Sequence, residues 1–139
     1  MVIVVMDGQG GGIGAAVIKA LRHEPALDHL EVLALGTNSI ATSRMMKSGA
    51  NRGATGENAV VQTCPQADII LGPMSIIMPN AMMGEVTPRM AEAVSTSTCR
   101  KILIPLTQER VSLVGTKGEP LPHLVDQVIR IIKEMAKDV

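Results

Sequence analysis

Short, continuous runs of β-branched and aliphatic residues alternate with longer stretches in which apolar residues recur three and four positions apart. The continuous runs are typical of strands buried on both faces, and the second pattern is typical of amphipathic helices. The runs predict strands at residues 2–6, 31–35, 50–54, 67–71 and 101–106. Helices are predicted from the first glycine-rich loop to residue 23, at 39–48 and 56–64, from Thr87-Pro88 onward, and from 121 to 137.

This alternation of strands and helices predicts an α/β fold built from βαβ units around a mostly parallel sheet. Because crossovers between parallel strands are right-handed, we expect a doubly wound, Rossmann-like sheet in the strand order 3-2-1-4-5. Residues 111–114 follow the fifth strand after only four residues, which predicts an antiparallel sixth strand at the edge. With 139 residues, 46% of them hydrophobic, the chain is expected to form a single domain over residues 1–139.

Composition argues against several classes of function. Thirteen basic residues balance thirteen acidic ones without a cluster of positive charge, so we expect no binding of nucleic acid. No uncharged apolar stretch is long enough to cross a membrane, and the N-terminus lacks the features of a signal peptide, so a cytoplasmic protein is expected. The cysteines and histidines form no metal-binding motif, and no metal site is expected.

The chain contains no Phe, Tyr or Trp. A bound base therefore has no aromatic ring to stack on and must lie between aliphatic side chains. Acid–base chemistry by a tyrosine is excluded for the same reason.

The loops after the carboxyl ends of the predicted strands hold the most distinctive residues of the chain. Ligands of doubly wound sheets bind at this edge. Four of these five loops contain glycine, and three of the four combine it with Asn, Thr or Ser, whereas the loops at the opposite edge have the composition of ordinary connectors. We therefore expect a binding site at the carboxyl edge of the sheet.

The strongest motif is the glycine loop, residues 7–14 (Asp-Gly-Gln-Gly-Gly-Gly-Ile-Gly), which follows the first strand and opens a helix. Its spacing fits both the G-x-x-x-G-x-G form of short-chain dehydrogenases and the G-x-G-x-x-A form of dinucleotide-binding proteins. Glycine lets a phosphate approach the main chain, and the helix N-terminus directs free N–H groups toward it. The predicted cofactor-binding residues of this loop are Gly8, Gln9, Gly10, Gly11, Gly12, Ile13 and Gly14.

Other loops at the same edge complete the predicted cofactor-binding set, with Thr37, Asn38, Thr55, Gly72 and Pro73. The glycine spacing favours NAD or NADP as the ligand. Dinucleotide-binding proteins hold the adenosine ribose with an acidic residue at the end of the second strand, and this chain lacks it. A mononucleotide or another phosphorylated metabolite is therefore an alternative ligand. Arg44 or Arg52 could bind the 2′-phosphate of NADP. The alternative is that both are ordinary surface charges.

Three side chains near this edge are candidates for catalysis: Asp7, Asn80 and Glu85. The alternative for each of the three is a structural role. For Asp7 we favour that role, in which its carboxylate accepts amide hydrogen bonds and shapes the loop. Because no acid–base pair or activated nucleophile is evident, we favour a binding or sensor module. The alternatives are a small enzyme whose site is completed by a second subunit of a homo-oligomer, and a structural protein whose glycine turn binds nothing.

Several segments together resemble a family of short, single-domain bacterial proteins described only as a domain of unknown function. They are the glycine loop, Leu35-Gly-Thr-Asn-Ser39, Gly53-Ala-Thr-Gly-Glu-Asn58, Ala67-Asp-Ile-Ile70 with Gly72-Pro73, and Lys101-Ile-Leu-Ile-Pro-Leu106. The resemblance covers nearly the whole chain and implies a Rossmann-like nucleotide-binding fold in a bacterial cytoplasm, without an activity or catalytic residues. The resemblance to short-chain dehydrogenases is confined to the glycine loop, and their Tyr-x-x-x-Lys chemistry cannot operate without a tyrosine.

Overall fold

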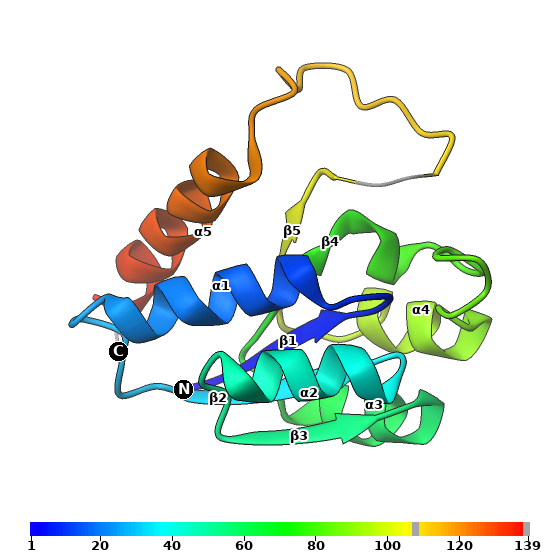
Figure 1. Cartoon of the computed structure of the whole chain (residues 1–139), viewed down its shortest axis with the longest axis horizontal. Helices are drawn as coiled ribbons and strands as arrows, with labels where there is room; N and C mark the ends of the chain where they lie inside the picture. Colours follow the sequence, from blue (N-terminus) through cyan, green and yellow to red (C-terminus); the bar gives the residue numbers. More distant parts are fainter. Residues whose placement is uncertain (107–108, 138–139) are drawn as a thin grey trace.

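The computed structural model describes residues 1–106 and 109–137, and the strands in these ranges form one parallel sheet (Figure 1). The strands are β1 (Val2–Asp7), β2 (Glu31–Gly36), β3 (Arg52–Thr55), β4 (Ile69–Pro73) and β5 (Arg100–Ile104). The helices are α1 (Gly12–His23), α2 (Ser39–Lys47), α3 (Glu57–Thr63), α4 (Pro88–Ser95) and α5 (Leu121–Ala136), with short 3-10 helices η1 (Cys64–Gln66) and η2 (Met74–Ile77). The strand order is β3-β2-β1-β4-β5, which confirms the predicted doubly wound α/β class.

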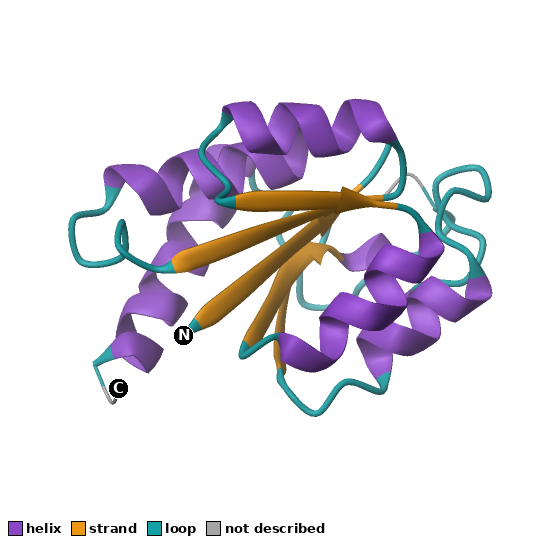
Figure 2. Ribbon diagram, turned by 90° about the horizontal axis from the view of Figure 1, so that it is seen from below, coloured by secondary structure: helices purple, strands orange, loops and turns teal. Residues whose placement is uncertain are grey.

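Helices cover both faces of the sheet (Figure 2). α1, α2 and α5 lie on one face, and α3 and α4 lie on the other. Along β1, Ile3 and Val5 pack with residues of the first group, whereas Val4 and Met6 pack with residues of the second. Because both faces of the central strands are covered, β1 and β4 carry apolar residues at successive positions, which explains the continuous runs in the sequence.

Two strands begin later than predicted. β3 begins at Arg52 rather than at residue 50, and β4 begins at Ile69 rather than at residue 67. Asn51 and Asp68 directly precede these strands, and each accepts a backbone N–H of the neighbouring strand with a side-chain oxygen at 2.7 Å. The regular ladder therefore starts one residue after each of these polar side chains.

The antiparallel sixth strand predicted at residues 111–114 is wrong. The structure has an arm, residues 109–120, that contains neither helix nor strand and connects β5 to α5 (Figure 1). Val111 and Leu113 are 39% and 40% exposed, and the backbone N–H of Val111 donates to the carbonyl of Glu109 at 2.7 Å in a local turn. The strand preference of aliphatic residues reflects packing against cross-strand neighbours, and within the described ranges these residues have none.

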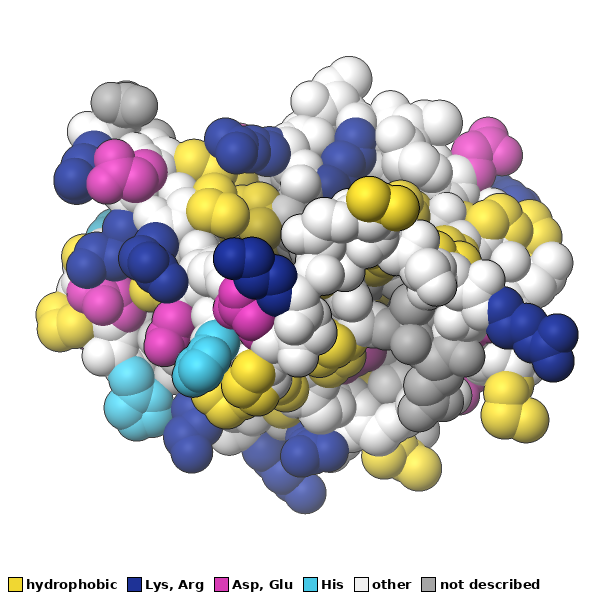
Figure 3. Space-filling view, turned by 90° about the horizontal axis from the view of Figure 1, so that it is seen from above, with side chains coloured by type: hydrophobic (Ala, Val, Ile, Leu, Met, Phe, Trp, Pro, Cys, Tyr) yellow, Lys and Arg dark blue, Asp and Glu magenta, His cyan; other side chains and the backbone are white. Residues whose placement is uncertain are grey.

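Basic and acidic side chains are interspersed on the face seen in Figure 3. The ion pair of Arg52 with Glu31, at 2.8 Å, is exposed on both sides and therefore contributes little stability. Among the residues described, no helix has the length and apolar character needed to cross a membrane.

Candidate functional site

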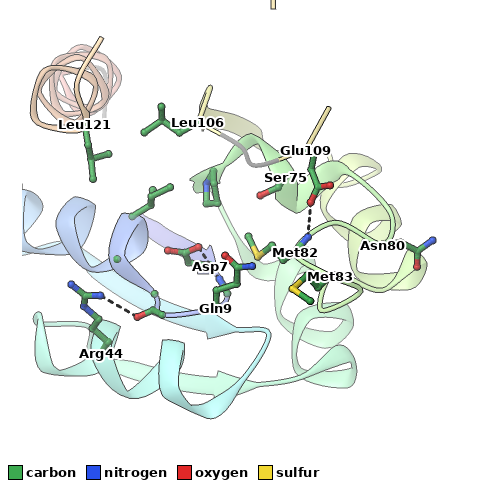
Figure 4. Close-up of a pocket in the computed structure, with 16 residues that line it drawn as sticks. Asp7, Gln9, Arg44, Ser75, Asn80, Met82, Met83, Leu106, Glu109 and Leu121 are labelled. Atoms are coloured by element: carbon green, nitrogen blue, oxygen red, sulfur yellow. Dashed lines mark hydrogen bonds between the residues drawn. The ribbon is translucent and has the colours of Figure 1, made fainter. Parts of the chain in front are cut away.

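A cavity of about 720 Å³ opens at the carboxyl edge of the sheet (Figure 4). Its lining comes from residues 7–13 of the glycine loop, from α2, and from β4 and the segment that follows it. Glu109 of the arm, Leu106 before the arm and Leu121 after it complete the lining. The cavity lies at the ends of β1 and β4, where the strand order reverses. Ligands of doubly wound sheets bind at this switch point.

Asp7 ends β1, and its carboxylate turns back onto the glycine loop. Oδ1 accepts the backbone N–H of Gly8 and Oδ2 accepts that of Gly14, both at 2.7 Å. Burial raises the pKa of the Asp7 carboxyl above its usual value, and the N–H groups of Gly14, Gly8 and Ile13 offset part of this rise. The side chain is only 3% exposed, and it holds the start of α1 against the end of β1.

The internal bonds of the glycine loop decide which N–H groups a ligand can reach. Gly11, with a left-handed φ of 72°, forms the turn, and its N–H donates to the carbonyl of Gly8 at 2.9 Å. The N–H of Gln9 donates to Glu85, and those of Gly8 and Gly14 donate to Asp7. Among the described residues, the N–H groups of Gly10 and Gly12 have no partner, and both residues line the cavity.

Arg44 of α2 supplies positive charge beside these two N–H groups. Its Nη1 donates to the carbonyl of Gly10 at 3.3 Å, and the same atom would lie 3.3 Å from a Cβ placed on Gly12. Arg44 is the only basic residue among the described residues that line the cavity. The sequence identified it as one of two arginines that meet a phosphate or remain surface charges, and the structure places it at the cavity.

Ser75 is a cavity residue that sequence reasoning missed. It lies in η2, two residues beyond Pro73, and Figure 4 shows its side chain pointing into the cavity. Ser75 is only 4% exposed, yet its hydroxyl makes no hydrogen bond to any residue that the structure describes. The signal in the sequence is its position just after the carboxyl end of a buried strand.

The remaining walls of the cavity are mostly aliphatic. Pro73 comes from β4, and Leu106 and Leu121 come from the two sides of the arm. The Glu109 carboxylate accepts the backbone N–H of Met82 at 2.7 Å, which joins the arm to the segment after β4 (Figure 4). An apolar part of a ligand would therefore contact aliphatic side chains, as the composition requires.

The structure brings together only some of the predicted site residues. Those that line the cavity are Asp7, Gly8, Gln9, Gly10, Gly11, Gly12, Ile13, Pro73 and Asn80, although Figure 4 shows the side chain of Asn80 pointing away from it. Those that do not line it are Gly14, Thr37, Asn38, Thr55, Gly72 and Glu85. Thr55 lies at the end of β3 and its hydroxyl is 2.7 Å from that of Thr42, far along the sheet edge from β4.

Glu85 forms a polar cluster with the loops after β1 and β2. Its Oε1 accepts hydrogen bonds from the N–H of Gln9 at 2.8 Å, the hydroxyl of Thr37 at 2.7 Å and Nδ2 of Asn38 at 2.8 Å. We call these four residues the Glu85 cluster. Burial raises the pKa of the Glu85 carboxyl, but the three hydrogen bonds outweigh it, so the pKa lies below its usual value. The cluster fixes the relative positions of three loops at the carboxyl edge.

The lowered pKa predicts that the Glu85 cluster loses strength in acid. A carboxyl whose pKa is lower in the folded state stabilises that state above its unfolded pKa, and this stabilisation disappears as the pH falls through the folded pKa. The difference in Tm between the wild type and Glu85→Gln should therefore shrink as the pH is lowered from neutrality to below about 4. Circular dichroism melts over this range measure it, and a difference independent of pH would contradict the role assigned to the carboxylate.

The fold and the cavity define a class, a doubly wound α/β protein with a glycine-loop cavity at its switch point. The chain belongs to the family described as "Domain of unknown function (DUF3842)", whose sequence profile matches residues 2–137. This confirms the resemblance found in the sequence. A universal stress protein, solved in complex with cAMP, is similar over 73% of this chain and 94% of that chain, with 15% sequence identity and a TM-score of 0.42. The curated proteins include no significant match.

Proposed function

We propose that residues 1–139 form a single cytoplasmic domain that binds a nucleotide or a related phosphorylated small molecule, as a binding or sensor module. The observation that carries this proposal is the Ser75 hydroxyl, which faces the same cavity as the N–H groups of Gly10 and Gly12 without a partner among the described residues. Ser75 is only 4% exposed as a residue, whereas Gly10 is exposed and Gly12 is half-buried, so the hydroxyl is the group with the least access to bulk water. A polar ligand in the cavity would pair all three groups at once.

A phosphate fits the polar side of the cavity. The N–H groups of Gly10 and Gly12 lie at the start of α1, where the helix dipole favours negative charge. The Arg44 guanidinium adds a full positive charge and is suited to paired hydrogen bonds with phosphate oxygens. The Asp7 carboxylate lies nearby, but its oxygens are engaged by the loop's own N–H groups.

The aliphatic walls fit the other part of a nucleotide. Pro73, Leu106 and Leu121 offer apolar surface on which a base or a sugar can pack. NAD and NADP, favoured by the glycine spacing, are the first ligands to test, together with mononucleotides and other phosphorylated metabolites. Because the chain has no Trp or Tyr, a nucleotide that co-purifies with the protein would show directly in its near-ultraviolet spectrum.

Arg44→Gln should weaken binding of any phosphorylated ligand by about tenfold or more, because a charge-assisted hydrogen bond is lost. Arg52→Gln is the matched control, since Arg52 is exposed on β3 and pairs with Glu31 away from the cavity. Isothermal titration of both variants with the same nucleotide measures the effect. Equal affinities of the two variants would remove Arg44 from the site.

Binding itself is tested by titrating the wild type with NAD⁺, NADP⁺, AMP and inorganic phosphate. We expect saturable binding of at least one nucleotide, with phosphate as a weaker competitor. If none of these compounds binds or shifts the Tm at millimolar concentration, the nucleotide proposal is abandoned and the glycine loop is architectural.

A second candidate is a small enzyme whose site is completed by another subunit of a homo-oligomer. The observation that favours it is Asp7, a carboxyl with a raised pKa that lines the cavity. Met83 at the cavity rim is 97% exposed, which suits contact with a second subunit. Turnover of a bound nucleotide that is lost in Asp7→Asn while binding survives would favour the enzyme over the binding module.

A further inference from the structure

We infer that the cavity takes a ligand with one nucleoside, a mononucleotide or a compound of that size, rather than a dinucleotide. The reason is that the Glu85 cluster fills the place where a doubly wound sheet normally receives the second nucleoside. This inference rests on the proposed function and narrows the ligand class of that site.

A dinucleotide spans the switch point of a doubly wound sheet. Its pyrophosphate lies on the glycine loop, and an acidic residue at the end of the second strand holds the adenosine ribose. In this chain the residues after β2 are Thr37 and Asn38, and neither is free for a ribose. Both direct their donors at Glu85 Oε1, at 2.7 Å and 2.8 Å, and Asn38 Nδ2 also donates to the carbonyl of Gln9 at 2.9 Å.

The space beside the glycine loop on this side is packed. A Cβ placed on Gly8 would lie 2.2 Å from Thr37 Oγ1, 2.6 Å from Met82 Sδ and 3.0 Å from Glu85 Oε1. These distances leave no room for a methyl group on Gly8, so the side chains of Thr37, Met82 and Glu85 pack directly against the glycine loop. Dinucleotide-binding proteins have a carboxylate near the end of β2 for the ribose. In this chain the carboxylate at that place comes from the segment after β4, and it binds the chain's own loops.

The segment that carries Glu85 is held in this position at several points. Asn80 N donates to the carbonyl of Val86 at 2.7 Å, and Glu85 N donates to that of Met82 at 3.1 Å. Met82 N is in turn bound by the Glu109 carboxylate of the arm. Met82 and Met83 keep left-handed φ values of 58° and 56°, a conformation that non-glycine residues rarely adopt without support from their surroundings.

The glycine loop is open where it faces the cavity. There the N–H groups of Gly10 and Gly12, Arg44 and the Ser75 hydroxyl face one cavity, with aliphatic walls beyond them. The N–H groups, Arg44 and Ser75 suit one phosphate, and the aliphatic walls suit one nucleoside. A second nucleoside inserted between the glycine loop and the end of β2 would have to separate Glu85 Oε1 from its three donors.

The experiment compares NAD⁺ with its two halves, AMP and nicotinamide mononucleotide, by isothermal titration of the wild-type protein. We expect NAD⁺ to bind no more than about threefold tighter than the better half, because its second nucleoside finds no site. An affinity for NAD⁺ about tenfold or more above that of the better half would overturn the inference while leaving the proposed function intact. If NAD⁺, both halves and inorganic phosphate all fail to bind, the proposed function fails and the inference falls with it.

A variant tests whether the Glu85 cluster is the cause. The readout is the ratio of the Kd of NAD⁺ to the Kd of the better half, which a general loosening of the protein leaves unchanged. We expect Glu85→Ala to shift this ratio in favour of NAD⁺, and Thr37→Val to shift it in the same direction by less. Glu57→Ala is the matched control, because Glu57 also accepts a threonine hydroxyl, at 2.6 Å, but does so from Thr87 at the N-terminus of α4. An unchanged ratio in folded Glu85→Ala and Thr37→Val would overturn the exclusion.

Discussion

Gly72→Ala should lower the free energy of unfolding by about 3 kcal/mol and the Tm by roughly 10 °C. Gly72 lies in β4, and a Cβ there would sit 2.4 Å from the carbonyl oxygen of Met6 in β1. Both strands are central in the sheet and carry helices on both faces, so neither backbone can move away alone. Urea and thermal unfolding followed by far-ultraviolet circular dichroism measure the change, since the chain has no tryptophan to report it.

Gly10→Ala is the control for this prediction. Both glycines were predicted from the sequence to bind a cofactor, but Gly10 is exposed, and the nearest atom to its Cβ would be Arg44 Nη1 at 3.8 Å. Its substitution should change the unfolding free energy by less than about 1 kcal/mol. If the two variants lost similar amounts of unfolding free energy, the close contact of β4 with β1 would not be the cause of the destabilisation by Gly72→Ala.

Arg22→Ala should lower the free energy of unfolding by about 3 kcal/mol, from the loss of hydrogen bonds to a charged group. Arg22 lies in the last turn of α1 and is half-buried. Its Nε donates to the carbonyl of Gly49 and its Nη1 to those of Asp28 and Leu30, all at 2.8 Å, and Nη2 donates to Asn51 Oδ1 at 2.6 Å. One side chain thus joins α1 to the loops before β2 and β3, and chemical denaturation quantifies its contribution.

Two further variants separate this effect from a general loss of charge. Arg52→Ala removes an arginine with a single exposed ion pair, and should cost no more than about 1 kcal/mol. Arg22→Lys keeps the charge but cannot reproduce the planar set of donors, so it should lose most of what alanine loses. A lysine variant as stable as the wild type would show that charge alone accounts for the stabilisation.

The sheet and the place of the cavity at its carboxyl edge could be predicted because local sequence determines them. The apolar runs at β1 and β4 record burial on both faces, and their alternation with amphipathic stretches leaves few topologies for a right-handed α/β fold. The glycine loop is contiguous in the sequence, so its place after β1 follows directly. Boundaries were less accurate where a polar side chain, such as Asn51 or Asp68, replaces the first bond of the ladder.

The features that were not predicted depend on contacts between distant residues. Glu85 reaches Thr37 across 48 positions of the chain, and no local pattern indicates that its carboxylate lies beside the glycine loop. Ser75 is distinctive only because its hydroxyl is left facing the cavity, which composition and spacing do not reveal. Residues 111–114 have the composition of a strand, but whether they form one depends on neighbours that the arm does not meet.

The arm also divides the chain into two very unequal parts. Beyond it the described chain contributes one helix, α5, whose buried face includes Val125, Val128 and Ile132 and packs with α1. Lys117, in the arm, is exposed between two glycines with left-handed φ, at Gly115 and Gly118. A protease that cuts there would leave a two-fragment complex held by this helix contact, and its stability would then depend on protein concentration, as that of a dimer does.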